Sequence, residues 1–139
     1  MALQMTASEV QAFIEEVFSQ VHHDFTILDL DEEGITVQLN YDDKHLRPGG
    51  TMSGPSMFGL ADVAFCMITL AHIGREALTV TTNCSIDFMR KPKAGNLIAK
   101  ARILKLGKQL SVGDVLIYAE GEEKPVARAN LTYAIPPKK

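Results

Sequence analysis

The hydrophobic pattern of this 139-residue chain changes its period twice along the sequence. Near the N-terminus apolar residues recur at helical spacing, and Ser8 is a suitable N-cap, which predicts an amphipathic helix over Glu9–Val21. The next two apolar groups, Phe25–Leu30 and Ile35–Asn40, suggest strands, and the second alternates apolar with polar residues. The segment Asp42–Ser53 contains a Pro-Gly-Gly sequence, so we expect a loop there.

A second helix is predicted over Gly54–Ile73, and it is apolar on nearly every face. Pro55 in the first turn loses no intrahelical hydrogen bond, and Gly74 is a good stop signal. The run is nearly long enough to span a bilayer, but it contains Asp62 and lacks flanking anchors. We therefore expect a buried helix of a soluble domain, with no membrane partner.

From residue 77 onward the pattern has period two, and four strands are predicted, at Thr79–Phe88, Leu97–Leu106, Leu110–Glu120 and Val126–Ile135. Short turns connect them, which predicts that consecutive strands pair antiparallel. The order of elements predicts one α+β domain over residues 1–139, in which a curved antiparallel sheet wraps the long helix.

The first of these strands has two unlike faces. Alternation places Val80, Thr82 and Cys84 on a face that can cover the helix. Thr81 and Asn83 fall on the opposite face, which is small and polar and can meet a second copy of the chain. The pattern therefore predicts a homodimer or a larger homo-oligomer.

Composition narrows the class of protein. The chain is 46% hydrophobic and 22% charged, as is typical of soluble globular domains, and its net charge of -3 argues against nucleic acid as the main partner. Cys66 and Cys84 lie in apolar runs and are interpreted as buried thiols, and the N-terminus lacks the basic region of a secretory signal. We expect a cytoplasmic protein. Because no phosphate-binding glycine loop or zinc-ligand spacing occurs, we expect no cofactor and no metal.

Asp62 is the one formally charged side chain between Arg47 and Arg75. A buried carboxylate is costly unless it is paired, hydrogen-bonded or protonated, so it serves either chemistry or a structural role at a dimer rim or on backbone donors. Gly54 begins the same helix, where unpaired N–H groups favour negative charge, and Asp62 follows eight residues later on the same face. An oxyanion donor plus a base or nucleophile is the minimum set for acyl transfer.

Two stretches, GGTMSGPSMFGLADVAF and SIDFMRKPKAGNLIAKARILKLGKQLSVGDVLIY, resemble the PaaI-like acyl-CoA thioesterases of the hotdog fold, and the resemblance covers roughly Leu39–Ile135. It implies dimers or tetramers with the active site at the subunit interface. It also implies that Asp62 activates water or attacks the thioester, while the N–H of Gly54 polarises the carbonyl. In the family a Ser or Thr from the partner's strand helps to place water; by position this role falls to Thr81, with Thr82 as the neighbouring option.

Three positions depart from the family pattern. Ser53 stands where the family has His, Pro55 replaces the Gly after Gly54, and Arg47 occupies the place of an Asn in the preceding loop. Ser53 remains a candidate catalytic residue, and Arg47 a candidate for substrate binding. Three further basic residues are candidates for the phosphates of coenzyme A or are solvated turn charges: Arg90, Lys91 and Lys108.

The expected activity is hydrolysis of a small or medium acyl-CoA thioester. The alternative is a hotdog module that binds acyl-CoA or another apolar ligand without turnover, which the altered helix start at Ser53 and Pro55 favours. A purely structural dimer would leave Asp62 unexplained.

Overall fold

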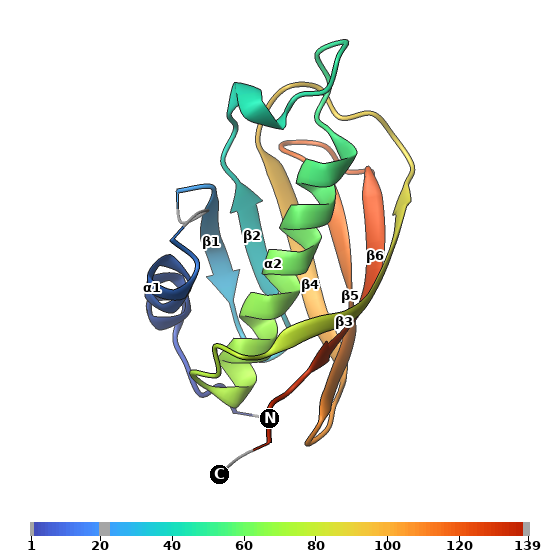
Figure 1. Cartoon of the computed structure of the whole chain (residues 1–139). Coiled ribbons are helices and arrows are strands. Elements are labelled where there is room, and N and C mark those ends of the chain that lie inside the picture. The colour runs from blue at the N-terminus through green and yellow to red at the C-terminus, as the bar shows by residue number, and fades with distance from the viewer. Residues whose placement is uncertain (1, 20–22, 138–139) are drawn as a thin grey trace.

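The structure, a computed structural model, describes residues 2–19 and 23–137. One antiparallel sheet curves around the long helix α2 (Gly54–Ile73), and the shorter helix α1 (Ala7–Val17) packs beside its edge (Figure 1). The strands are β1 (Phe25–Leu30), β2 (Ile35–Leu39), β3 (Val80–Phe88), β4 (Leu97–Leu106), β5 (Leu110–Ala119) and β6 (Ala127–Ala134). The predicted α+β architecture, with a wrapped central helix, is confirmed.

The start of α1 lies upstream of the predicted cap at Ser8. The hydroxyl of Thr6 accepts a hydrogen bond from the N–H of Glu9, and the Glu9 carboxylate accepts one from the N–H of Thr6. This reciprocal pair satisfies two backbone donors at once, so Thr6 rather than Ser8 caps the helix. Helix α1 ends at Val17 with Phe18 as its C-cap, which is earlier than the predicted end at Val21, a residue outside the described part of the chain.

Helix α2 supplies the centre of the core. Most of its side chains from Met57 to His72 are buried, against inward-facing sheet residues such as Val37 and Ile117. By length and composition α2 passes the test for a membrane span, and it is the one helix of the described residues that does. About 67% of its apolar window is buried inside the protein, which agrees with the predicted buried helix, because a largely apolar surface needs cover from other elements.

The strand order is β1-β2-β4-β5-β6-β3, so β3 pairs with β6 and not with its sequence neighbour β4. The prediction that consecutive strands pair was wrong at this connection. Both sides of β4 are occupied, by β2 and β5. The connecting segment 89–96 instead bonds the loop before α2, through Pro92 O to Met52 N and a bridge between Thr51 and Lys93.

The two edges of the sheet differ. At the β1 edge the carboxamide of Gln11 accepts from the N–H of Ile27 and donates to the carbonyl of Phe25, each at 2.9 Å, and so replaces a neighbouring strand. The β3 edge has nine residues, and its apolar side chains Val80 and Phe88 are 54% and 51% exposed. Since a long exposed edge strand invites pairing with another chain, the structure leaves one edge open and closes the other.

Helix α2 and strand β5 approach each other closely at Gly113. A Cβ atom placed on Gly113 would lie 2.1 Å from the carbonyl oxygen of Arg102 and 2.4 Å from the ring of Phe65. No real Cβ tolerates such distances to backbone, so only glycine permits this contact.

We therefore predict that Gly113→Ala lowers the free energy of unfolding by about 3 kcal/mol or more, measured by urea denaturation, because the chain must shift to relieve the overlap. Gly59→Ala is the matched control. A Cβ on Gly59 meets nothing within 4 Å, so alanine in this helix should raise stability by about 0.5–1 kcal/mol. Equal effects at both positions would contradict the packing described here.

Candidate active site

Asp62 lies half-buried on α2, and one oxygen of its carboxylate is held by two hydroxyl groups. The hydroxyls of Thr81 and Tyr133 each donate to Oδ1 at 2.6 Å. The Tyr133 hydroxyl also lies 2.8 Å from the backbone oxygen of Asp62. Two O–H donors stabilise the charged form of a carboxylate and fix its orientation, while no hydrogen bond from the described residues engages Oδ2.

These hydroxyls belong to one row that crosses the sheet. Thr81 of β3 pairs in register with Tyr133 of β6, which pairs with Ser111 of β5. Ser111 hydrogen-bonds Thr69 of α2 at 3.0 Å in the core. One row of the sheet therefore supplies all three hydroxyls that anchor α2, two of them on Asp62.

Tyr133 is a site residue that the sequence analysis missed. Its side chain is 3% exposed, and its ring packs against Phe65 with centroids 5.6 Å apart. Burial is the main reason that the pKa of Tyr133 is raised far above its usual value, with the nearby Cys66 and Asp62 as further causes, so this hydroxyl stays protonated and donates. The alternating pattern of the last predicted strand places Tyr133 on its inward face, and this position could have identified it as a candidate.

Thr81 faces the helix, whereas simple alternation placed it on the opposite face. The register of β3 against β6 shifts between Thr81 and Asn83, which makes Thr82 the extra residue of a β-bulge. The hydroxyl of Thr82 donates to the carbonyl of Thr132 and does not reach Asp62. The bulge thus turns the side chain of Thr81 toward α2. The threonine hydroxyl that bonds Asp62 therefore comes from the same chain rather than from a partner's strand.

A cavity of about 300 Å³ opens beside Asp62, between α1, α2 and the start of β3. Three polar side chains at one end are those of Asp62, Thr81 and Tyr133. Most of the remaining lining is apolar: Phe13, Ile14, Val17, Phe18, Val63, Cys66, Leu70, Ala77 and Val80. A carboxylate at the end of an apolar cavity is the usual form of a small-molecule site.

The thiol nearest to this carboxylate is not a nucleophile. Burial, followed by the charge of Asp62, raises the pKa of Cys66 to about 12. The same two causes raise the pKa of Cys84. Both thiols therefore stay neutral at physiological pH, so the charged groups that line the cavity are the carboxylates of Asp62 and Glu76, and Asp62 is the one that the hydroxyls of Thr81 and Tyr133 hold.

The start of α2 carries the second candidate feature. The Ser53 hydroxyl accepts from the N–H of Ser56 and donates to the Ser56 hydroxyl, so the helix cap occupies it. A Cβ on Gly54 would lie 3.4 Å from the ring of Phe88, which crosses the helix start. Pro55 in the first turn has no N–H to offer, which leaves Gly54 as the donor predicted for the oxyanion.

A separate hollow of about 470 Å³ opens at this helix start and contains three of the predicted basic residues. Arg47, Arg90 and Lys91 line it together with Gly54, and none of its lining residues is acidic. Positive side chains and a helix N-terminus both favour an anion. Lys108 lies instead in the turn between β4 and β5 and lines neither this hollow nor the Asp62 cavity.

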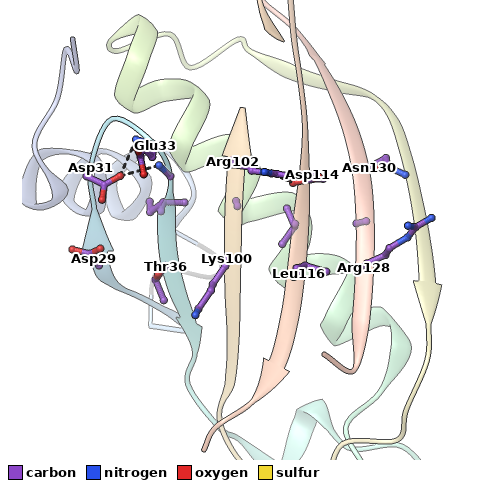
Figure 2. Close-up of a pocket in the computed structure, with 15 residues that line it drawn as sticks. Asp29, Asp31, Glu33, Thr36, Lys100, Arg102, Asp114, Leu116, Arg128 and Asn130 are labelled. Atoms are coloured by element: carbon purple, nitrogen blue, oxygen red, sulfur yellow. Dashed lines mark hydrogen bonds and ion pairs between the residues drawn. The ribbon is translucent and has the colours of Figure 1, made fainter. Parts of the chain in front are cut away.

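The opposite face of the sheet has a larger pocket, of about 550 Å³, with a different character (Figure 2). Its lining is rich in charged side chains of both signs: Arg102 of β4 forms an ion pair with Asp114 of β5 within the pocket, and Arg128 pairs with Asp87 outside it. None of the predicted site residues lines it. We therefore place the candidate active site on the helix side of the sheet.

The sequence pattern of the thioesterase superfamily matches residues 49–126. This segment spans more than half of the chain and contains Gly54, Asp62 and Thr81. The chain belongs to the thioesterase superfamily, whose members hydrolyse thioesters, and its fold is the hotdog fold of the PaaI-like group.

Individual relatives agree with this family. A solved "putative thioesterase" of Silicibacter sp. TM1040 is 55% identical, with 99% of this chain and 96% of that chain covered and a TM-score of 0.92. The Escherichia coli PaaI protein, from the phenylacetic acid degradation operon, is 27% identical over 92% of this chain and 96% of that chain, with a TM-score of 0.74. A "putative esterase" of Saccharolobus solfataricus is 28% identical over 94% of this chain and 86% of its own length.

The raised pKa of Cys66 predicts very slow alkylation of this thiol. At pH 8.5 an ordinary cysteine is about half ionised, whereas a thiol with a pKa of about 12 is ionised at a fraction on the order of 10⁻³ to 10⁻⁴. In Cys84→Ser protein, the rate of iodoacetamide modification should therefore be on the order of a thousand times lower than in the urea-denatured protein. It should rise about tenfold per pH unit up to about pH 11. Fast modification of the native protein at pH 8.5 would contradict the neutral thiol.

Proposed function

We propose that the protein hydrolyses acyl-CoA thioesters to the free acid and coenzyme A, with Asp62 as the general base or nucleophile. The observation that carries the proposal is the Asp62 carboxylate, oriented by Thr81 and Tyr133 at the end of an apolar cavity. The basic hollow at the start of α2 has the charge that the phosphates of coenzyme A require.

In the base route, Asp62 takes a proton from a water molecule, and the resulting hydroxide adds to the thioester carbonyl carbon. The oxygen becomes an oxyanion that the N–H of Gly54 stabilises, after which the C–S bond breaks and the thiolate of coenzyme A leaves and takes up a proton. In the nucleophile route, Asp62 itself adds to the carbonyl carbon, the C–S bond breaks, and the thiolate of coenzyme A leaves and takes up a proton, which gives a mixed anhydride that water then hydrolyses to the acid and free Asp62. In a single turnover in ¹⁸O-water, unlabelled acid together with label on Asp62 identifies the nucleophile route with attack of water on the Asp62 carbonyl, whereas label in the acid is expected for the base route and for attack of water on the acyl carbon of the anhydride.

One chain alone cannot bring Gly54 and Asp62 to the same carbonyl. Eight residues of α-helix separate them by ~12 Å along the axis. An oxyanion donor and a base must each lie within about 3 Å of the carbonyl oxygen or of the attacking water. We therefore propose a site shared between two copies of the chain, with Gly54 from one and Asp62 from the other.

The open β3 edge supports this shared site. Antiparallel pairing of β3 with a second β3 would extend the sheet and turn the two α2 helices in opposite directions. The start of one helix would then move toward the middle of the other. Gln11 blocks the same pairing at the β1 edge, so β3 is the edge that we propose for the homodimer.

The alternative, binding without turnover, rests on the same helix start. Pro55 removes one donor, and Ser53 is occupied by the cap, so a single predicted N–H remains for the oxyanion. Losing one such donor commonly costs ~10²–10³ in rate. Hydrolysis and binding without turnover differ in whether the thiol of coenzyme A is released when acyl-CoA binds.

We predict that the purified protein releases thiol from acyl-CoA and that two variants, Asp62→Asn and Gly54→Pro, are each nearly inactive. Asp62→Asn removes the base, which should cost ~10²–10⁴ in kcat. Gly54→Pro removes the N–H, and proline in the first turn of a helix loses no intrahelical bond. Mixing the two variants after partial unfolding and refolding should restore activity, because one site of each heterodimer combines an intact Gly54 with an intact Asp62.

The control is each variant refolded alone, with helix content checked by circular dichroism. Saturable binding of acyl-CoA without thiol release in the unmodified protein would favour the binding module. Active Asp62→Asn protein would remove Asp62 from the mechanism, and single variants that are each inactive and gain no activity on mixing would exclude a shared site.

A further inference from the structure

We infer, on the basis of the proposed function, that the acyl group of the substrate occupies the cavity beside Asp62 and that it is an uncharged, apolar chain or ring of about six to ten carbon atoms. The basic hollow at the start of α2 does not suit such a group. In the shared site the two spaces hold different parts of the substrate: the anionic carrier lies at the α2 start of one copy, and the acyl group lies beside α1 of the other.

The cavity extends along one face of α2, away from the helix start. Asp62, Cys66 and Leu70 are spaced four residues apart and all line it, which gives it a length of roughly 12 Å along the helix. Asp62 and the two hydroxyls that hold it lie at one end of this row, and the proposed function places the thioester there. An acyl group that enters there can extend toward Leu70.

The volume of the cavity sets the size of the acyl group. An apolar cavity of about 150 Å³ holds one benzene molecule in another protein. The cavity here is about 300 Å³, twice that volume. By the same ratio it has room for about twelve carbon atoms at most, so a group of about six to ten fits, whereas an acetyl group would leave most of it empty and a palmitoyl group is too long.

The charge of the residues that line the cavity determines which chemical class of acyl group it accepts. Apart from Asp62, the charged residue that lines the cavity is Glu76, and no Lys or Arg does. An acyl chain that ends in a carboxylate would be desolvated against apolar walls and would meet a like charge. The cavity thus favours neutral acyl groups over dicarboxylic ones of the same length.

Helix α1 forms the outer wall. Phe13, Ile14, Val17 and Phe18 come from its last turns, and Val17 and Phe18 are 45% and 44% exposed although they are large and apolar. Such side chains at the rim gain burial when an apolar ligand fills the space beside them. The opposite wall includes Ala77, whose small side chain leaves this space open.

The test compares acyl-CoA substrates that differ in one property each. Octanoyl-CoA should have a kcat/KM at least ~10-fold above those of acetyl-, palmitoyl- and suberyl-CoA, the last of which differs from octanoyl-CoA only by a terminal carboxylate. Ala77→Phe fills the cavity and should lower kcat/KM for octanoyl-CoA at least ~10-fold while acetyl-CoA hydrolysis changes by less than about twofold. Leu78→Phe is the matched control, since Leu78 is 77% exposed and does not line the cavity.

A protein that hydrolyses all four substrates equally, or an Ala77→Phe variant with unchanged preference, would overturn the inference while the proposed function stands. If no acyl-CoA is hydrolysed, the proposed function fails, and binding measured by calorimetry decides the inference instead. Octanoyl-CoA should then bind more tightly than suberyl-CoA and lose that advantage in Ala77→Phe. Equal binding of both would overturn the inference in that case as well.

Discussion

The hydrogen bonds that Thr81 and Tyr133 donate to one oxygen of Asp62 are the interaction on which the rest of the structure depends. Without them, the most apolar helix of the chain would carry an unsatisfied carboxylate at its interface with the sheet, which is costly. With them, one carboxylate oxygen is anchored, and the other accepts no hydrogen bond from the described part of the chain and lies beside the cavity. The same contacts connect α2 to β3 and β6, so the site and the packing of the helix share one set of bonds.

The asymmetry of the sheet has a related consequence. Gln11 covers one edge, and β3 leaves the other open. In the proposed reaction this asymmetry matters, because the oxyanion donor and the base of one chain are two helical turns too far apart to serve one thioester. A pairing surface next to Asp62 is what a site divided between two copies requires. Oligomerisation and activity are therefore expected to be lost together.

Local patterns in the sequence predicted the elements well, since they depend on neighbours along the chain. The bounds predicted for the long helix, Gly54–Ile73, are those of α2, and the isolation of Asp62 among apolar residues is what pointed to it as a candidate site residue. Contacts between distant segments were harder to predict from the sequence. The bulge at Thr82, which turns Thr81 toward the helix, and the pairing of β3 with β6 depend on how the sheet closes around α2. Tyr133 lies 71 positions from Asp62, so no local pattern links the two.

The most direct test of this account is a double-mutant cycle on the two hydroxyls, with kcat as the readout. Thr81→Val and Tyr133→Phe each remove one donor and keep the shape of the side chain. A charge-assisted hydrogen bond is worth about 1.5–3 kcal/mol, so each variant should lower kcat roughly tenfold or more with little change in KM, and the double variant should be non-additive because both donors serve the same oxygen. Wild-type kcat in both single variants would show that the orientation of Asp62 does not control the reaction.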